Sequence, residues 1–473
     1  MSPIHSSFLE QLNRSSLTRP MWRLWLLSAG LIGLDGFDFF IIGVAMPFIQ
    51  QDFGLGPEAV GAIATAAVVG ALVGSLTLGP ITDRVGRQLM LLVDIGIFIL
   101  ASAGAAFAWN PAALIAFRFL VGVGIGADYP ISVSYITENV PMRFRGRMVI
   151  GAFSFQAVGA LFGALLGIVT IGLCRALAPD SVEWATHYAW RAMLAVGLVL
   201  AVLIGLLRLA FLLESPCYYL AKENYKAASE SASQLLEQKI ELSPATEPTA
   251  SASRLGYGDL FSRQYLRRTA LAALPWFLQD IATYGIGIFT PTIIATLALA
   301  PRAGLLSESM AGAEGAAFVN MFLIGGFILA ILLVDRVGRI SLQVLGFAGM
   351  ALGLLLLSFS GGGTPGATHY GLLFGGFILF NLAMNAGPNS TTFLLSGEVF
   401  PPAIRAGGAG LAAAIAKAGA VVGAYGLPIW QATFGIVHLL RFLSAICVLA
   451  AALTYLLRVE VKTESAAEAV EPS

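Results

Sequence analysis

The chain has 473 residues, of which 57% are hydrophobic and 11% are charged, and its 27 basic residues equal its 27 acidic residues in number. Soluble domains carry about 25% charged residues, so the composition excludes a large soluble protein, and the zero net charge gives no indication of nucleic-acid binding. Three cysteines, Cys174, Cys217 and Cys447, are scattered without the spacing of a metal site or a disulfide framework.

Apolar stretches of about 20 residues, the length that crosses a bilayer as an α-helix, recur along the whole chain. They are continuous and lack the alternation of β-barrel strands, and their abundant Gly and Ala suit close helix packing in lipid. We therefore expect an all-α integral membrane protein. Its twelve transmembrane helices are predicted at about residues 22–45, 60–80, 88–108, 112–136, 149–172, 190–213, 267–294, 314–334, 342–360, 369–396, 408–430 and 436–457.

The basic residues are distributed unevenly among the loops that connect these spans. With an intracellular N-terminus, the inner segments hold 20 of the 27 Lys and Arg residues. The outer loops hold only Arg175, Arg191, Arg302 and Arg441. The positive-inside rule therefore predicts a multi-pass protein of the plasma or inner membrane with both termini in the cytoplasm.

One long polar segment divides the twelve spans into six and six. Within it, the stretch SPATEPTASAS (243–253) is typical of a flexible linker, and AKENYKAASESASQLLEQ predicts a short amphipathic helix on the inner membrane surface. The predicted organisation is a cytoplasmic tail (1–21), a first six-helix bundle (22–213), a cytoplasmic central loop (214–266), a second six-helix bundle (267–457) and a cytoplasmic tail (458–473).

Two loops of the first half reappear in the second half. GPITDRVGRQ (79–88) follows the second span and VDRVGRIS (334–341) follows the eighth, 252 residues later. ENVPMRFR (138–145) and EVFPPAIR (398–405) follow the fourth and tenth spans, 260 residues apart. Similar loops at matching places indicate a duplicated unit of six spans, which is a known transporter design.

These motifs resemble those of the major facilitator superfamily. GPITDRVGRQ is similar to its inner-loop signature, and RFLVGVGIGADYP, GEVFPPAIR and LLESPCYYL resemble its sugar-porter-like and phosphate-porter branches. WFLQDIATYG, GIGADYP, NAGPNSTTFLLSGEVFP and the lysine of AAIAKAGAVVG together resemble the phosphate:proton symporters more closely than the sugar porters. The resemblance implies two pseudo-symmetric six-helix bundles that function as a monomer, without a cofactor or a metal.

The repeated basic loops predict a gate between the two halves. Asp83, Arg84 and Arg87 can cap a helix end and pair across the seam, and pairs of this kind must break when that face opens. The alternative is that each loop is basic only because it lies on the cytoplasmic side of the membrane. The predicted gating residues are Asp83, Arg84, Gly86, Arg87, Glu138, Arg145, Asp335, Arg336, Arg339, Glu398 and Arg405.

Ionisable side chains inside the spans point most directly to a functional site, because an ionised Asp at the centre of a membrane helix costs about 3 kcal/mol. Trp276, Asp280 and Tyr284 are spaced four residues apart, so a helix places them on one face. The other candidates are Asp35 and Asp38 in the first span, Arg118, Asp128 and Tyr129 in the fourth, Gln156 in the fifth, Asn385 and Asn389 in the tenth, and Lys417 in the eleventh. Asp94 and Arg208 lie nearer the inner helix ends, where snorkelling or pairing gives them a structural role.

The resemblance to the symporters assigns roles to most of these residues. The substrate contacts that it implies are Tyr129, Gln156, Trp276, Asp280, Tyr284 and Asn389, and Lys417 is the nearby lysine that answers the charge of the substrate. The proton-coupling residues that it implies are Asp35 or Asp38, Asp128 and Asp280, with Arg118 in the fourth span. The alternatives are ion pairs with Arg118 or Lys417 that orient the helices, packing aromatics, and amides that join helices by hydrogen bonds.

The residue types fit this chemistry without the resemblance. Tyr, Trp and amide side chains are neutral donors that surround an oxyanion. An ionised Asp280 would repel an anion, whereas a protonated one donates a hydrogen bond, and burial disfavours the charged form of a carboxyl group. A single buried carboxyl group can therefore couple the binding of a proton to the binding of an anion.

The leading hypothesis is proton-driven symport of inorganic phosphate by alternating access. The alternative within transport is a proton symporter of a carboxylate or an aromatic acid, because LDGFDFF resembles the first-span signature of that branch, and a sugar is a weaker choice. A nutrient sensor that binds its ligand without moving it is the alternative from another class. No nucleophile–base set, metal-ligand cluster or Walker-type loop indicates an enzyme. The expected partners are a small anion, protons and the lipid bilayer.

Overall fold

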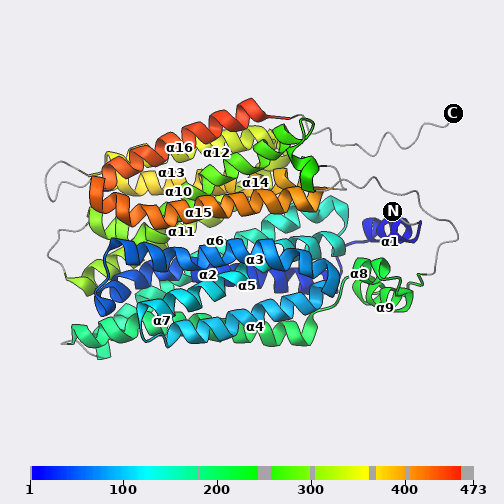
Figure 1. The fold of residues 1–473 in the computed structure, drawn as a ribbon, viewed down its shortest axis with the longest axis horizontal. Coiled ribbons are helices and arrows are strands. Elements are labelled where there is room, and N and C mark those ends of the chain that lie inside the picture. The colour runs from blue at the N-terminus through cyan, green and yellow to red at the C-terminus, as the bar shows by residue number, and fades with distance from the viewer. Residues whose placement is uncertain are drawn as a thin grey trace.

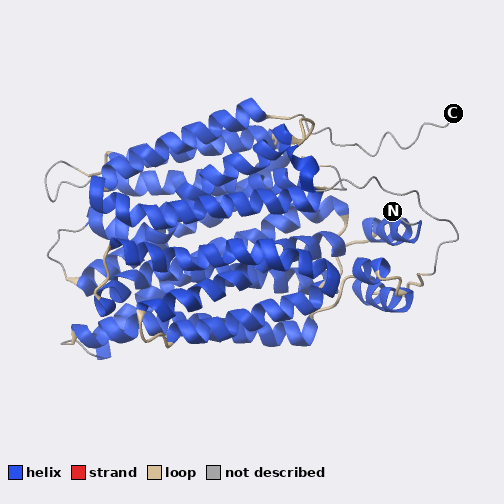
Figure 2. Ribbon diagram, viewed as in Figure 1, coloured by secondary structure: helices blue, strands red, loops and turns tan. Residues whose placement is uncertain are grey.

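The computed structural model describes residues 3–177, 181–242, 257–298, 304–361, 369–400 and 404–459. Within these ranges the secondary structure consists of helices and their connections, without a β-strand (Figure 2). The predicted all-α class is therefore confirmed.

Twelve segments of the described chain are long and apolar enough to span a membrane, which confirms the predicted number. They are α2 (Arg19–Phe53), α3 (Pro57–Val85), α4 (Arg87–Ala106), α5 (Pro111–Asn139), α6 (Met142–Leu177), α7 (Val182–Phe211), α10 (Leu266–Ala298), α11 (Leu305–Val337), α12 (Arg339–Ser358), α13 (Tyr370–Ala386) together with α14 (Pro388–Glu398), α15 (Arg405–Phe434) and α16 (Ile436–Leu457). The remaining helices are α1 (Pro3–Arg14), α8 (Pro216–Ala221), α9 (Tyr225–Leu236) and a short 3₁₀ helix at Tyr257–Phe261.

Local capping signals extend several of these helices beyond the apolar stretches that predicted them. Thr18 precedes α2, and its hydroxyl accepts a hydrogen bond from the backbone N–H of Met21 at 3.4 Å. Gly54 ends α2 with a φ of 64°, a conformation that glycine adopts without steric cost. α2 therefore covers 35 residues, whereas the hydrophobic pattern alone predicted about residues 22–45.

The tenth span is broken into two helices at Gly387 and Pro388. Proline has no N–H to continue a helical ladder, and its ring excludes the preceding residue from helical geometry. α13 therefore ends at Ala386 and α14 restarts at Pro388. A Cβ at Gly387 would come within 2.7 Å of both the Cα of Gly346 and the carbonyl oxygen of Leu342 on α12, so the break also sits at a close helix crossing.

The spans form two halves that lie side by side, with α2 to α7 in the lower half of Figure 1 and α10 to α16 in the upper half. Across the boundary, α3 packs on α15, α6 packs on α11, and α2 packs on α10. The α2–α10 crossing is very close, because a Cβ at Gly43 would lie 1.7 Å from the carbonyl oxygen of Ile288. Glycine at this position allows the two backbones to touch.

The helices α1, α8 and α9 lie together at one end of the bundle, which we call the capped end (Figure 1). Phe8 and Leu12 of α1 are fully buried in one apolar cluster with Ala228 and Leu235 of α9. The Thr18 hydroxyl donates a hydrogen bond to the carbonyl of Leu235 at 2.7 Å. The predicted amphipathic helix of the central loop therefore forms, but its apolar face packs against protein, because the N-terminal segment supplies a partner helix.

Candidate functional site

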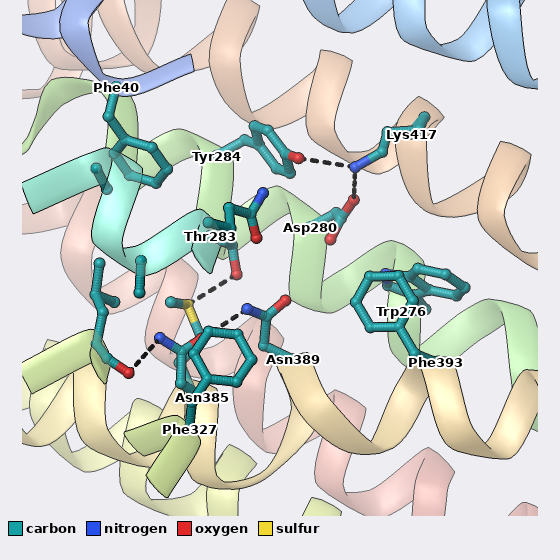
Figure 3. A pocket seen from close by; sticks show the side chains of 15 residues that line it. Phe40, Trp276, Asp280, Thr283, Tyr284, Phe327, Asn385, Asn389, Phe393 and Lys417 are labelled. Atoms are coloured by element: carbon teal, nitrogen blue, oxygen red, sulfur yellow. Dashed lines mark hydrogen bonds and ion pairs between the residues drawn. The ribbon is translucent and has the colours of Figure 1, made fainter. Parts of the chain in front are cut away.

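A small cavity lies between the two halves, about midway along the spans. Its volume is about 30 Å³, which accommodates roughly two water molecules. The side chains that line it (Figure 3) come from α2, α6, α10, α11, α13, α14 and α15. An anion of several heavy atoms therefore needs these side chains to move apart before it fits.

Six of the seven predicted substrate-binding residues line this one cavity. They are Gln156, Trp276, Asp280, Tyr284, Asn389 and Lys417. The seventh, Tyr129, lies outside the residues whose side chains the structure describes. Residues that are up to 261 positions apart in the sequence thus share one site, which the helical spacing of single spans does not reveal.

The charged centre of the cavity is an ion pair between Lys417 on α15 and Asp280 on α10. The Lys417 Nζ lies 3.4 Å from the Asp280 Oδ2, and it donates a hydrogen bond to the Tyr284 hydroxyl at 2.8 Å (Figure 3). The Asp280 and Lys417 side chains are 3% and 10% exposed. The resemblance gave Asp280 and Lys417 separate contacts with the substrate and left an ion pair with Lys417 as the alternative. The structure pairs the two side chains, because a buried ion is stabilised by a close partner.

A chain of amide groups faces the ion pair. The Asn389 Nδ2 donates to the Asn385 Oδ1 at 2.6 Å, and the Gln279 Nε2 lies within hydrogen-bond distance of the Asn389 Oδ1 (3.3 Å) and the Thr283 hydroxyl (3.0 Å). The Asn385 Nδ2 donates to the backbone carbonyl of Leu323 at 3.0 Å, which anchors the chain on α11. Gln279 and Thr283 are absent from the sequence prediction. Their spacing of four residues on α10, one position before Asp280 and Tyr284, is the signal that identifies them.

Aromatic side chains close the cavity on the side of the capped end. The ring of Phe393 on α14 stacks on Phe153 of α6 with centroids 4.2 Å apart, and it meets Trp276 edge-on at 4.7 Å. The Phe153–Phe393 stack joins the two halves. On the other side of the cavity, Phe39 of α2 meets the ring of Tyr284 edge-on at 5.4 Å.

The first half contains a second set of buried charges. Asp38 pairs with Arg118 at 2.7 Å, which realises the structural alternative that the sequence left open for that carboxylate. The Arg208 Nη2 lies 3.2 Å from the Asp128 Oδ1, and the Arg208 Nη1 lies 3.9 Å from the Asp94 Oδ2. Asp35 is fully buried and within electrostatic range of Asp128 and Asp94.

Of the two structural roles expected for Asp94 and Arg208, snorkelling is wrong, whereas pairing is observed between their side chains at 3.9 Å. Both side chains are buried, with residue exposures of 1%, so neither snorkels to an interface. Neighbouring helices cover them, and Arg208 also donates to the backbone carbonyl of Leu91 at 2.9 Å. Three carboxyl groups, those of Asp35, Asp94 and Asp128, therefore share the neighbourhood of one guanidinium group.

The predicted gating residues lie at the capped end, and several of them form ion pairs. Arg339 bonds to Glu398 at 3.2 Å and to Asp335 at 3.3 Å, all within the second half. Arg147, which the sequence prediction did not include, contacts the other half, where it lies 3.9 Å from Asp335. Arg145, which it did include, instead donates from its Nε to the carbonyl of Val140.

The remaining gating predictions divide into described and undescribed residues. Gly86 adopts a φ of 110° at the start of α4, and a Cβ there would lie 2.6 Å from a carboxylate oxygen of Glu214. Arg336 is exposed, and Glu138 is half-buried. The side chains of Asp83, Arg84, Arg87 and Arg405 lie outside the described residues.

Comparisons with known proteins agree with this architecture. The family described as sugar (and other) transporter matches residues 27–471. Inorganic phosphate transporter 1-1 of Oryza sativa subsp. japonica is 30% identical over 427 residues, which cover 83% of this chain and 80% of that protein. Inorganic phosphate transporter 1-2 of the same species is 31% identical over 426 residues, with coverages of 83% and 80%.

Solved structures show the same fold. The major facilitator superfamily proton:xylose symporter XylE, bound to 6-bromo-6-deoxy-D-glucose, matches with a TM-score of 0.71 and 18% identity, over 93% of this chain and 96% of that chain. A partially occluded, inward-open conformation of the xylose transporter XylE from E. coli matches with a TM-score of 0.72 and 17% identity, over 95% and 100% of the two chains. At these identities the likeness shows the fold alone.

Proposed function

Because this chain belongs to the sugar (and other) transporter family, we propose that it carries inorganic phosphate across a membrane together with protons, by alternating access of its two halves. The names of the similar phosphate transporters support the choice of substrate. The observation that carries the proposal is the Lys417–Asp280 pair in a cavity between the halves, opposite the amide of Asn389.

The residues of the cavity suit a small oxyanion. The Lys417 ammonium group, the Trp276 indole and the amides of Asn389 and Gln156 are hydrogen-bond donors. A phosphate monoanion that binds beside an intact Lys417–Asp280 pair leaves one uncompensated negative charge in the cavity. A proton on Asp280 removes that charge and leaves Lys417 to pair with the anion. Binding of phosphate and binding of a proton therefore favour each other.

We propose that the buried carboxyl groups of the first half form a second proton-binding site. Asp94 and Asp128 face the guanidinium group of Arg208, and Asp35 lies within electrostatic range of all three, so full ionisation would place three negative charges near one positive charge. Like charges at close range favour protonation of one partner. We assign the coupling role to Asp35 and Asp128. Asp38 is the less favoured alternative, because Arg118 already balances its charge at 2.7 Å.

Alternating access requires a closure on each side of the cavity. We propose that the capped end faces the cytoplasm, as the positive-inside rule predicts, and that residues 22–213 and 267–457 move as two halves of one monomer in the plasma or inner membrane. The Phe153–Phe393 stack and the Arg147–Asp335 contact then close the cytoplasmic side. The Gly43–Ile288 crossing closes the outer side.

The test is uptake of labelled phosphate into liposomes that contain the purified protein, with the outside buffer more acidic than the lumen. We expect phosphate to accumulate, and we expect a protonophore or the substitution Asp280→Asn to abolish the accumulation. The exposed Glu183→Gln is the matched control and retains uptake. Accumulation of benzoate-type acids or hexoses but not phosphate would reject the substrate, and pH-driven phosphate accumulation by the Asp280→Asn protein would reject the coupling.

A further inference from the structure

A second, larger hollow lies at the capped end of the second half, away from the cavity between the halves. The ends of α10, α12, α14 and α16 surround it, and its volume is about 1140 Å³. α16 and α12 lie along the upper edge of the molecule in Figure 1. This hollow, which we call the basic groove, is lined by Arg267, Arg339, Arg458, Glu398, Leu345 and Tyr455 among others.

The charge of the basic groove is positive. Its lining includes three guanidinium groups and one carboxylate, that of Glu398, which Arg339 already holds at 3.2 Å. Arg267 is exposed and donates from its Nη2 to the carbonyl of Leu456 at 3.0 Å. Arg458 is exposed, and its guanidinium group lies 4.1 Å from the ring centroid of Tyr455. Among the residues that the structure describes, neither Arg267 nor Arg458 forms an ion pair, so two cationic groups are held at the groove without an anionic partner.

The wall of the basic groove is apolar on its membrane side. Leu345 of α12 is 63% exposed, and Tyr455 of α16 is 55% exposed, on spans whose outer surface faces lipid. Val344 extends the same wall. Guanidinium groups at the end of a span, next to an exposed apolar wall, match a molecule with an anionic head and an apolar tail. A free phosphate ion makes no use of the wall.

We propose that the basic groove binds the headgroup of an anionic phospholipid from the leaflet at the capped end. Arg267 and Arg458 bind the phosphate group, because a guanidinium group presents paired N–H donors to phosphate oxygens. Leu345 and Tyr455 contact the first part of the acyl chains. The site is separate from the transport cavity and binds lipid whether or not the protein carries phosphate.

The test measures binding to the purified full-length protein in neutral detergent, by native mass spectrometry and by the thermal unfolding midpoint. The probes are short-chain phosphatidylglycerol, short-chain phosphatidylcholine and inorganic phosphate. We expect phosphatidylglycerol to bind in preference to phosphatidylcholine. Each basic residue near a membrane surface contributes about fivefold to the binding of an anionic lipid, so Arg267→Gln with Arg458→Gln should weaken binding roughly thirtyfold.

The control variant is Arg441→Gln, whose guanidinium group lies 5.4 Å from the ring centroid of Phe359 at the other end of the second half. We expect it to bind phosphatidylglycerol as the unchanged protein does. Equal affinity of the double variant and the unchanged protein would overturn the proposal. Stabilisation by inorganic phosphate that depends on Arg267 and Arg458 would also overturn it, in favour of a free-anion site.

A third measurement addresses the C-terminal segment as a rival occupant. Residues 460–473 contain four Glu and one Lys and follow directly after Val459, which lines the basic groove. A protein that ends at Val459 should bind phosphatidylglycerol with unchanged affinity. Phosphatidylglycerol binding that appears only after this deletion would show that the acidic segment fills the groove in the full-length protein and would overturn lipid as its occupant. None of these measurements depends on transport, so they succeed or fail independently of the proposed symport.

Discussion

The buried pair of Lys417 and Asp280 predicts strong energetic coupling between two residues that are 137 positions apart. Lys417→Met removes the ammonium group and keeps the length of the side chain, and Asp280→Asn removes the carboxylate charge and keeps its shape. Either single change leaves an uncompensated charge among side chains that are at most 10% exposed. Breaking a buried ion pair in this way costs about 3–5 kcal/mol of folding stability.

The double variant distinguishes pairing from simple proximity. With both charges removed, no ion remains buried without a partner, so the double variant should cost no more than the larger of the two single changes. The coupling free energy is then about 3 kcal/mol. The lost hydrogen bond from Lys417 to the Tyr284 hydroxyl, 2.8 Å long, adds about 1 kcal/mol to any variant that lacks Lys417.

The assay is reversible unfolding of the four proteins in mixed micelles, analysed as a double-mutant cycle. Lys239 and Glu241 provide the control pair, because their side chains approach to 2.9 Å but are 86% and 80% exposed, and we expect their cycle to show no measurable coupling. Effects of Lys417→Met and Asp280→Asn that add to within about 0.5 kcal/mol would show that the two groups do not interact and would refute the reasoning.

Two further predictions concern other parts of the molecule. Gly43→Ala places a Cβ 1.7 Å from the carbonyl oxygen of Ile288, so α2 and α10 must move apart by more than 1 Å and phosphate uptake should fall at least tenfold. Gly30→Ala is the control, because a Cβ at Gly30 has nothing within 4 Å. Normal uptake by the Gly43→Ala protein would contradict the close crossing. Arg208→Leu leaves the carboxyl groups of Asp94 and Asp128 without a cation, so the unfolding free energy should fall by about 3–5 kcal/mol at neutral pH. The loss should be smaller at acidic pH, because protonation of the carboxyl groups removes their negative charge. An equal loss at both pH values would argue against the charge cluster.

The number of spans was predictable because each membrane helix is a continuous apolar stretch of sequence. Such a stretch can be recognised without knowing which helices pack beside it. Helix ends depend on smaller signals. Thr18 and Gly54 lengthen α2 beyond its apolar stretch, and the adjacent Gly387 and Pro388 divide the tenth span, which the hydrophobic pattern predicted as a single helix. Each of these signals is visible in the sequence once its geometric meaning is known.

The site was predictable only within each helix. The spacing of Trp276, Asp280 and Tyr284 fixes a common face on α10, and that face lines the cavity. Which cation meets Asp280 depends on how α10 packs against α15, and a hydrophobic pattern carries no information about that crossing. The same limit explains Arg208, because its burial comes from surrounding helices and not from its own position near the end of α7.

The packing of α1 has a practical consequence for production of the protein. The segment before the first span is polar, so a shortened version of the protein for expression would normally omit it. Phe8 and Leu12 are fully buried, however, and their loss would leave Leu235 and the neighbouring apolar side chains of α9 facing water. Versions that start at the first span should therefore aggregate more readily and survive detergent extraction less well than versions that keep Pro3–Arg14.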